Sequence, residues 1–193
     1  MKTNKTITLL GKELTISQTY KSRGYGLTET IEAIEIDIKE LNNFITSEED
    51  AEQLKEEMIE YTYNEVYNSC KSQAEQGEAL YAYKTLSIFL KRSELRSDGY
   101  ISASAMYVEC NGGSERSITF ADLDIDRKEE EDEDGNEIED SVKYNAILDA
   151  LQRQEFSRRM SEEERGEFEC LEDKALENYK HLHPEEFDEE EDN

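Results

Sequence analysis

Apolar and polar residues alternate along several short runs of the chain, and each run predicts a half-buried β-strand. Residues 6–10 and 14–17 flank Gly11-Lys12, an arrangement that predicts a β-hairpin. A glycine-containing loop over residues 22–26 separates this hairpin from the next run. The further strands are expected at residues 30–38, 80–90, 100–108 and 117–125, with turns at Asp98-Gly99 and Asn111-Gly112-Gly113.

The remaining apolar residues recur every three or four positions, which is the period of a helix. Ser47 and the acids after it predict the start of a first helix, which ends near Gly77. A second helix is expected over residues 140–160, and Ser161 with Glu164 forms a capping-box pattern that begins a third. The predicted inward residues are Leu54, Met58, Tyr61 and Val66 in the first helix, Tyr144, Ile147, Leu148 and Leu151 in the second, and Phe168, Leu171, Ala175, Tyr179 and Leu182 in the third.

These elements predict an α+β fold with an antiparallel sheet of five or six strands, a crossing acidic helix and a C-terminal helical pair. The expected organisation is an α+β domain over residues 1–126, which includes the helix at 47–76, followed by an acidic loop over 127–139. A helical region over 140–183 and a disordered acidic tail over 184–193 complete the chain.

Charge is distributed very unevenly along the 193 residues, whose formal net charge is −27. Residues 1–46 and 81–121 carry net charges of 0 and +1, whereas residues 47–80 and 122–193 carry −8 and −20. Such a surface repels phosphate, so we expect no direct binding of nucleic acid. Apolar runs long enough for a membrane span or a signal peptide are absent from the sequence, and we expect a cytoplasmic protein. The three cysteines, Cys70, Cys110 and Cys170, lie far apart, which predicts reduced, buried thiols.

The most regular acidic feature is a row of four glutamates spaced four residues apart along the first helix. Glu48, Glu52, Glu56 and Glu60 become neighbours on the helix surface, where each like-charged pair costs about 0.2–0.5 kcal/mol. Folding does not require this arrangement, so we interpret it as a binding surface for a cationic partner. The predicted contact residues are Glu48, Glu49, Glu52, Glu56 and Glu60, with Glu129, Glu130, Glu131, Asp132, Glu133 and Asp134 of the loop as a second patch.

Motifs for metals and catalysis are incomplete. The frame that starts at Asp122, Asp124 and Asp126 has Arg127 where a calcium loop needs glycine. A second frame, which begins at Glu130, has Gly135 in place but ends on Ser141 instead of glutamate. His181 and His183 lie beside Pro184 at the edge of the tail, and nucleophile, Walker and zinc-protease motifs do not occur. We therefore expect neither cofactor nor metal, and a metal-dependent enzyme built on the three aspartates stays open as an alternative.

Small size, extreme acidity and a neutral sheet combined with acidic helices resemble the DNA-mimic anti-defence proteins of phages and mobile elements, such as antirestriction and anti-CRISPR proteins. The Lys-, Glu-, Ile- and Asn-rich segments 1–5 and 41–45 are similar to proteins of AT-rich Gram-positive bacteria and their phages. The resemblance covers charge pattern and size, without a shared motif. It implies inhibition of a bacterial nuclease by occupation of its nucleic-acid-binding or PAM-reading surface.

Together these observations predict a non-enzymatic inhibitor that binds a host nucleic-acid-binding protein, a CRISPR-Cas effector such as Cas9 being the expected target. Steering by long-range charge would speed the encounter and make it salt-dependent. Charge that serves solubility alone, a phage structural or assembly protein, and a general acidic protein-binding module remain alternatives. A homodimer is left open.

Overall fold

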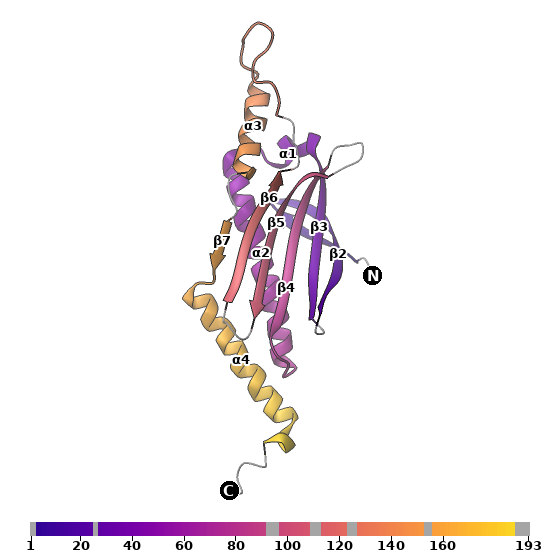
Figure 1. Cartoon of the computed structure of the whole chain (residues 1–193), viewed down its shortest axis with the longest axis vertical. Helices are drawn as coiled ribbons and strands as arrows, with labels where there is room; N and C mark the ends of the chain where they lie inside the picture. The colour runs from indigo at the N-terminus through magenta and orange to yellow at the C-terminus, as the bar shows by residue number, and fades with distance from the viewer. Residues whose placement is uncertain are drawn as a thin grey trace.

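The computed structural model describes residues 3–24, 27–91, 97–108, 113–122, 127–152 and 156–187. Seven strands and three main helices make up the fold (Figure 1). The N-terminal half contains β1 (Thr3–Leu9), β2 (Lys12–Gly24), β3 (Leu27–Asp37), η1 (Ile38–Glu40), α1 (Leu41–Phe44) and α2 (Glu48–Glu75). The C-terminal half contains β4 (Tyr81–Lys91), β5 (Ser97–Val108), β6 (Gly113–Asp122), α3 (Glu139–Gln152), β7 (Phe156–Arg159), α4 (Glu162–Leu182) and η3 (Pro184–Glu186).

The sheet is mixed. Strands β1 to β4 form a four-stranded sheet in which β3 and β4 run parallel, with Ile34 opposite Ile88. Backbone pairing continues through β5, β6 and β7, so that the spatial order of the strands equals their order in the chain. Every other pairing in this sheet is antiparallel.

The prediction of an antiparallel sheet is therefore wrong at its centre, and the described residues form seven strands where five or six were expected. The physical reason is α2, which lies between β3 and β4 in the chain and returns it to the end of the sheet at which β3 began. A strand, a helix and a neighbouring strand joined in this way run parallel. The α+β class and the acidic helix packed against the sheet are confirmed.

The first hairpin turns at Leu10 and Gly11, one position earlier than predicted. Leu9 pairs with Lys12, and both turn residues have positive φ, 51° for Leu10 and 69° for Gly11. A two-residue turn of this kind matches the twist of the strands, but a leucine in this conformation costs about 1–2 kcal/mol. The backbone N–H of Leu10 donates to Oε2 of Glu57 at 2.6 Å, which offsets part of that cost and ties the turn to α2.

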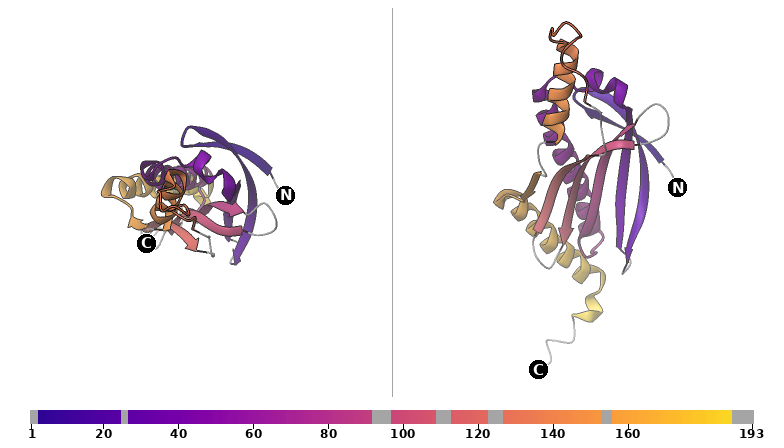
Figure 2. Two further views of the ribbon diagram at one scale, coloured as in Figure 1. Left: turned by 90° about the horizontal axis from the view of Figure 1, so that it is seen from above. Right: turned by 45° about the horizontal axis from the view of Figure 1, so that its top comes forward.

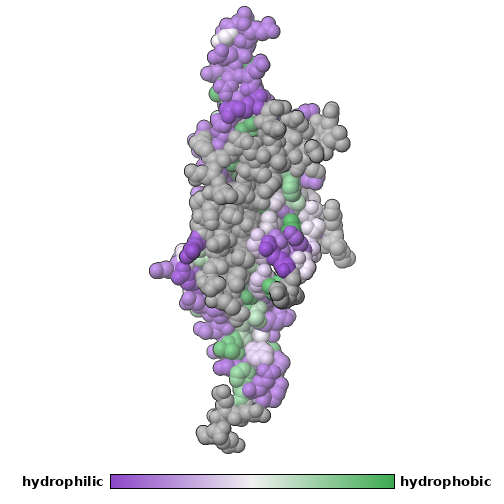
Figure 3. All heavy atoms as spheres, viewed as in Figure 1, coloured by the Kyte–Doolittle hydropathy of each residue, from purple (hydrophilic) through white to green (hydrophobic). Residues whose placement is uncertain are grey.

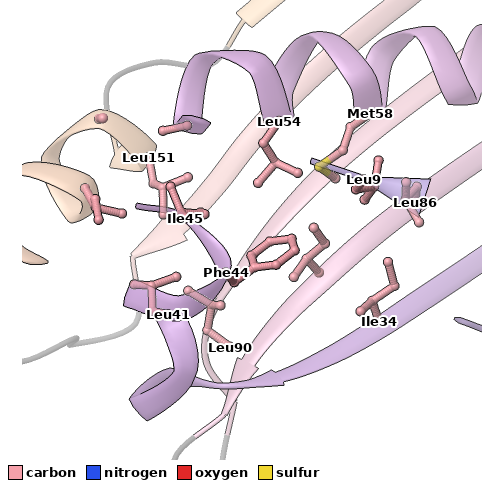
Figure 4. Packing of buried hydrophobic residues seen from close by; sticks show 14 of the residues in the cluster. Leu9, Ile34, Leu41, Phe44, Ile45, Leu54, Met58, Leu86, Leu90 and Leu151 are labelled. Atoms are coloured by element: carbon pink, nitrogen blue, oxygen red, sulfur yellow. The ribbon is translucent and has the colours of Figure 1, made fainter. Parts of the chain in front are cut away.

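Two apolar clusters join the helices to the sheet. In the larger one, Leu54 and Met58 of α2 pack against Leu86 of β4, and Leu151 of α3 closes the cluster from the side (Figure 4). In the smaller one, Phe168 of α4 lies against the C-terminal half of α2. The inward residues predicted for α2 and α3 are buried, except that Tyr61 is half-buried.

The C-terminal region departs from the predicted helical pair. The helix expected over residues 140–160 ends at Gln152, and Phe156–Arg159 pairs with β6 as the seventh strand. Without β7, one edge of β6 would leave its backbone N–H and C=O groups unpaired, and a helix continued through residues 156–159 could not pair with them. The capping box at Ser161 is confirmed, with α4 beginning at Glu162. The predicted tail begins with a 3₁₀ turn at Pro184–Glu186, and its last residues, 188–193, lie outside the described chain.

The molecule is long and narrow. α3 and the hairpin before it project at one end, and α4 extends toward the other end (Figures 1 and 2). α2 runs between these ends on one side of the sheet, and both α3 and α4 pack against it. At a rise of about 1.5 Å per residue, the 28 residues of α2 span about 40 Å.

Candidate functional site

The N-terminus of α2 is fixed by its caps. The Ser47 hydroxyl accepts a hydrogen bond from the Asp50 backbone N–H, and Oδ2 of Asp50 accepts bonds from both the backbone N–H and the hydroxyl of Thr46. The hydrogen bonds from Thr46 lower the pKa of Asp50 below its ordinary value. Three acids in the first turn also interact favourably with the helix dipole. The helix therefore presents its first turns in a defined orientation.

We use the name acidic surface for the predicted glutamates of α2. All five are exposed, which agrees with the sequence pattern: Glu48, Glu49, Glu52, Glu56 and Glu60. Four of them, with Gln53 and Glu57, surround an open depression. Lys55 is the single cation within this stretch of helix, and its Nζ lies 2.7 Å from Oε1 of Glu52. In the described chain, Glu49 and Glu56 have no ion-pair partner.

The density of charge along this part of α2 is high. Seven carboxylates lie between Glu48 and Glu60. At a rise of about 1.5 Å per residue this segment spans about 18 Å, which gives about one carboxylate per 3 Å of axis. Most of these groups remain on the surface, because the inward positions of the same turns are taken by Ala51, Leu54 and Met58.

The second predicted patch forms a hairpin instead of an irregular loop. Glu131 pairs with Glu137 as an isolated β-bridge, and Gly135 turns the chain with a φ of 78°. The carboxylate of Asp132 accepts hydrogen bonds from the backbone N–H groups of Asp134 and Asn136 and from the Asn136 side chain. These bonds, that from the Asn136 backbone foremost, lower the pKa of Asp132. The segment is exposed throughout, as an acidic loop would be, and one of its acids organises the turn.

This hairpin is attached to α3. The Asn145 side chain accepts from the backbone N–H of Lys128 and donates both to its carbonyl and to Oε1 of Glu130. Arg127 forms a bidentate pair with Asp149, the closer distance being 2.6 Å. The remaining acids of the patch are exposed: Glu129, Glu131, Glu133 and Asp134.

The two patches lie toward the same end of the molecule. α3 packs through Leu148 and Leu151 into the cluster that contains Leu54 of α2, so the helix that carries the hairpin lies beside the N-terminal half of α2. The hairpin projects beyond it as a hydrophilic tip (Figures 1 and 3). Sequence reasoning identified both patches, whereas only the fold places them at one end.

Neither of the incomplete calcium-loop frames in the sequence provides a set of free ligands among the described side chains. The aspartate frame at residues 122–126 lies outside the part whose side chains are described. In the second frame, Asp132 is occupied by the turn and Ser141 is buried at the start of α3. Among the described residues, His183, Glu185 and Glu186 bring ligand atoms within 4.8 Å of one another, although Glu186 already accepts a hydrogen bond from Tyr179.

A buried ionic cluster under α2 was not predicted from the sequence. Nζ of Lys84 in β4 lies 2.7 Å from Oε1 of Glu32 in β3 and 2.8 Å from Oε2 of Glu65 in α2. Lys5 of β1 lies 2.9 Å from the other oxygen of Glu65. The Tyr61 hydroxyl donates to Oε2 of Glu32 at 2.6 Å. The sequence does not single out this pair, because β3 also carries Glu29, Glu35 and Asp37, and only the pairing of β3 with β4 brings Glu32 to Lys84.

The positive and negative charges of this cluster are paired with one another. The side chains of Glu32 and Lys84 are 0% and 5% exposed, so each needs the other. Burial raises the pKa of Glu65, but hydrogen bonds from Lys84 and Lys5 outweigh it, and the pKa lies below its ordinary value. Burial and the bond to Glu32 raise the pKa of Tyr61, which keeps its hydroxyl protonated as a donor. Because both lysines are paired with carboxylates, we interpret the cluster as a structural joint.

A polar cleft of about 470 Å³ lies beside this joint, between the C-terminal half of α2 and strands β2 to β4. Thr28, Thr30 and Ser69 contribute hydroxyl groups, and Tyr20 contributes an exposed ring. Glu65 also lines the cleft, but its carboxylate is already paired with Lys5 and Lys84. Among its described lining residues no nucleophile is paired with a base, so the cleft offers hydrogen bonds but no catalytic arrangement.

Two of the three cysteines, Cys70 and Cys170, belong to the described residues. Cys70 is buried in α2 as predicted, and burial raises the pKa of its thiol to about 12. Cys170 is exposed on α4, contrary to the prediction, because it lies on the side of the helix away from Phe168 and Leu171. Cys110 lies outside the described residues.

No protein-family model matches the chain, and neither the curated proteins nor the solved structures contain a match to it. Among the described helices, none combines the length and the apolar character that crossing a membrane requires.

Proposed function

We propose that this protein is an inhibitor that binds the cationic surface with which a partner protein holds nucleic acid. The observation that carries the proposal is the dense series of exposed carboxylates on the capped N-terminal half of α2, where Lys55 is the single cation and pairs with Glu52 alone. Counted over all seven carboxylates of residues 48–60, the density of about one charge per 3 Å of helix axis compares with one phosphate per about 3.4 Å along each strand of duplex DNA. A surface that binds phosphates through arginine and lysine can accept carboxylates in the same way.

The energetics of α2 support a role outside folding. Glu52, Glu56 and Glu60 repel one another at a cost of about 0.2–0.5 kcal/mol per neighbouring pair, and Lys55 neutralises only one of them. A cationic partner would relieve this repulsion on binding. The same charges would accelerate the encounter through long-range attraction that salt weakens.

The hairpin before α3 supplies a second contact. Its exposed acids project from the end of the molecule at which the acidic surface begins, and the hydrogen bonds of Asp132 and Asn145 hold them in place. A partner groove that contacts both patches at once would have to match their relative positions as well as their charge. This favours a specific complex over general attraction to basic proteins.

The resemblance to anti-defence proteins implies that the partner is a bacterial nuclease, and a CRISPR effector such as Cas9 is the first candidate. The test is a competition assay in which the protein displaces labelled DNA or guide-loaded substrate from purified host nucleases, CRISPR effectors included. We expect displacement at about 0.15 M salt that weakens at about 0.5 M, because screening shortens the range of charge contacts.

Two variants with the same change in net charge locate the contact. The first carries Glu49→Lys, Glu52→Lys, Glu56→Lys and Glu60→Lys on the acidic surface. The control carries Glu163→Lys, Glu169→Lys, Asp173→Lys and Glu177→Lys on exposed positions of α4. We expect the first to lose inhibition by a factor of about ten or more and the control to retain it. Full inhibition by the first variant, or equal loss in both, would remove the proposed surface.

A further inference from the structure

An apolar groove lies at the end of the molecule opposite the acidic surface. It has a volume of about 620 Å³ and runs between the turn after α2 and the C-terminal half of α4. Ala79 and Leu80 line it on the first side, and Ala175, Leu176 and Tyr179 line it on the second. In Figure 3 hydrophobic residues gather on the lower part of the molecule, beside hydrophilic ones.

Exposed hydrophobic residues concentrate on α4, which forms one side of the groove, and on the turn after it. Five large hydrophobic side chains of the described chain are exposed, and three of them belong to α4 and the turn after it. They are Leu176, Leu182 and Phe187, which are 51%, 56% and 41% exposed. Leu182 was predicted to face inward because it continues the three- and four-residue steps of Ala175 and Tyr179. It is exposed because α4 extends past the end of α2, and such a concentration on an acidic protein indicates an interaction surface.

The groove is held in shape by a close contact between the helices. Gly77 has a φ of 69°, and a Cβ at that position would lie 2.8 Å from the backbone nitrogen of Tyr179. The Asn178 side chain donates to the carbonyl of Ala74 at 2.8 Å, and Lys174 pairs with Glu75 at 3.5 Å. A preformed groove costs less ordering on binding than one that must open.

Acidic side chains contribute to the groove and follow it in the chain. Glu78 and Glu172 belong to the lining, and Glu185 and Glu186 follow α4 within a few residues of His183, which also lines it. A second copy of this chain, with a net charge of −27, would be repelled by these acids. The complementary occupant is apolar on one side and cationic at its flanks. The walls come from α4 and from the turn at the end of α2, a setting in which an amphipathic helix can dock through its side chains.

We propose that the groove between α4 and the end of α2 binds a basic amphipathic helix of a partner protein. Apolar residues of that helix cover Leu176 and Leu182, and its lysines or arginines face Glu78 and Glu172. This site is separated from the acidic surface by most of the length of α2. It therefore adds a second, hydrophobic docking point and does not depend on the function proposed above.

The test measures fluorescence anisotropy of a labelled peptide of about 18 residues that contains only leucine and lysine in an amphipathic helical order. Its control is a peptide of identical composition in scrambled order. We expect the amphipathic peptide to bind about tenfold more tightly or better, and this preference to survive at about 0.5 M salt because burial of apolar area is not screened.

Variants assign the binding to the groove. Leu176→Ser with Leu182→Ser removes exposed side chains, so the fold is retained, and we expect the preference for the amphipathic peptide to disappear. Tyr20→Ser, which removes an equally exposed ring elsewhere, is the matched control and should keep it. The four-lysine variant of the acidic surface should also keep it. Equal affinity of the wild-type protein for both peptides would overturn the proposal. So would a preference that the four-lysine variant loses and the double-leucine variant keeps.

Discussion

The two halves of α2 use the same residue type in opposite ways. In the N-terminal half, Glu49 and Glu56 are exposed and unpaired within the described chain. In the C-terminal half, Glu65 is half-buried and contacts two lysines from β1 and β4. The difference arises from the residues beneath the helix. The N-terminal half packs on an apolar cluster, whereas the buried pair Glu32–Lys84 lies beneath the turn that carries Glu65.

The role of a glutamate in this acidic helix therefore depends on which residues the fold places beside it. Glu65 stabilises the joint between α2 and the sheet, whereas the acidic surface destabilises the isolated helix slightly. The two kinds of glutamate should therefore respond differently to mutation, pH and salt.

The largest expected effect is the removal of a charge from the buried cluster. Lys84→Met leaves Glu32 fully buried without its cation, and we expect a loss of about 3–5 kcal/mol in the free energy of unfolding, measured by urea denaturation. Lys71→Met, an exposed lysine of α2, is the control and should change stability by less than about 0.5 kcal/mol. Adding Glu32→Leu to Lys84→Met should restore much of the loss. A Lys84→Met protein as stable as the wild type would show that the cluster is not desolvated.

A smaller loss in the free energy of unfolding is expected at the contact between the turn after α2 and α4. Gly77→Ala forces a Cβ into a left-handed residue against the Tyr179 backbone, and we expect a loss of about 1–2 kcal/mol or more. Gly166→Ala places a Cβ in open space within α4 and should instead stabilise the protein by about 0.5–1 kcal/mol. Thermal unfolding of the two variants measures the contrast. Equal melting temperatures would contradict the close packing at Gly77.

The pH dependence of stability should distinguish Glu65 from the exposed acids. Because its pKa is lowered in the folded state, Glu65 stabilises the protein above the pKa of the unfolded chain, about 4.3. This contribution is lost as the pH falls through the folded pKa. In urea titrations between pH 6 and about pH 3, Glu65→Gln should flatten the acid limb, whereas Glu49→Gln should leave it close to wild type. An unchanged slope in Glu65→Gln would exclude the proposed pairing.

The smallest effect concerns the acidic surface itself. Glu56→Gln removes two like-charge contacts, with Glu52 and Glu60, and should raise the free energy of unfolding by about 0.4–1 kcal/mol at low salt. The gain should vanish at about 0.5 M salt, where exposed charges are screened. A loss of stability on this substitution would mean that Glu56 contributes to the fold, and the case for a binding role would weaken.

Most secondary structure followed from local patterns. The strands alternate, the helices repeat every three or four residues, and caps such as Ser47 and Ser161 have strong local chemistry. The short strand β7 was missed, because four residues carry little periodic signal and their conformation depends on the open edge of β6. The parallel pairing of β3 with β4 was missed although a strand, helix and strand in succession implies it.

The sequence determined where the carboxylates of α2 are dense and that its inward positions are apolar, since both follow from a periodicity within one segment. Only the tertiary structure decided that Glu65 is paired and Glu56 is not, that the hairpin lies toward the same end as the acidic surface, and that Leu182 is left uncovered. These outcomes depend on which segments become neighbours and in what register. Residues as far apart as Lys5, Glu32, Glu65 and Lys84 meet only when the strands and α2 are assembled, and no local pattern records that meeting.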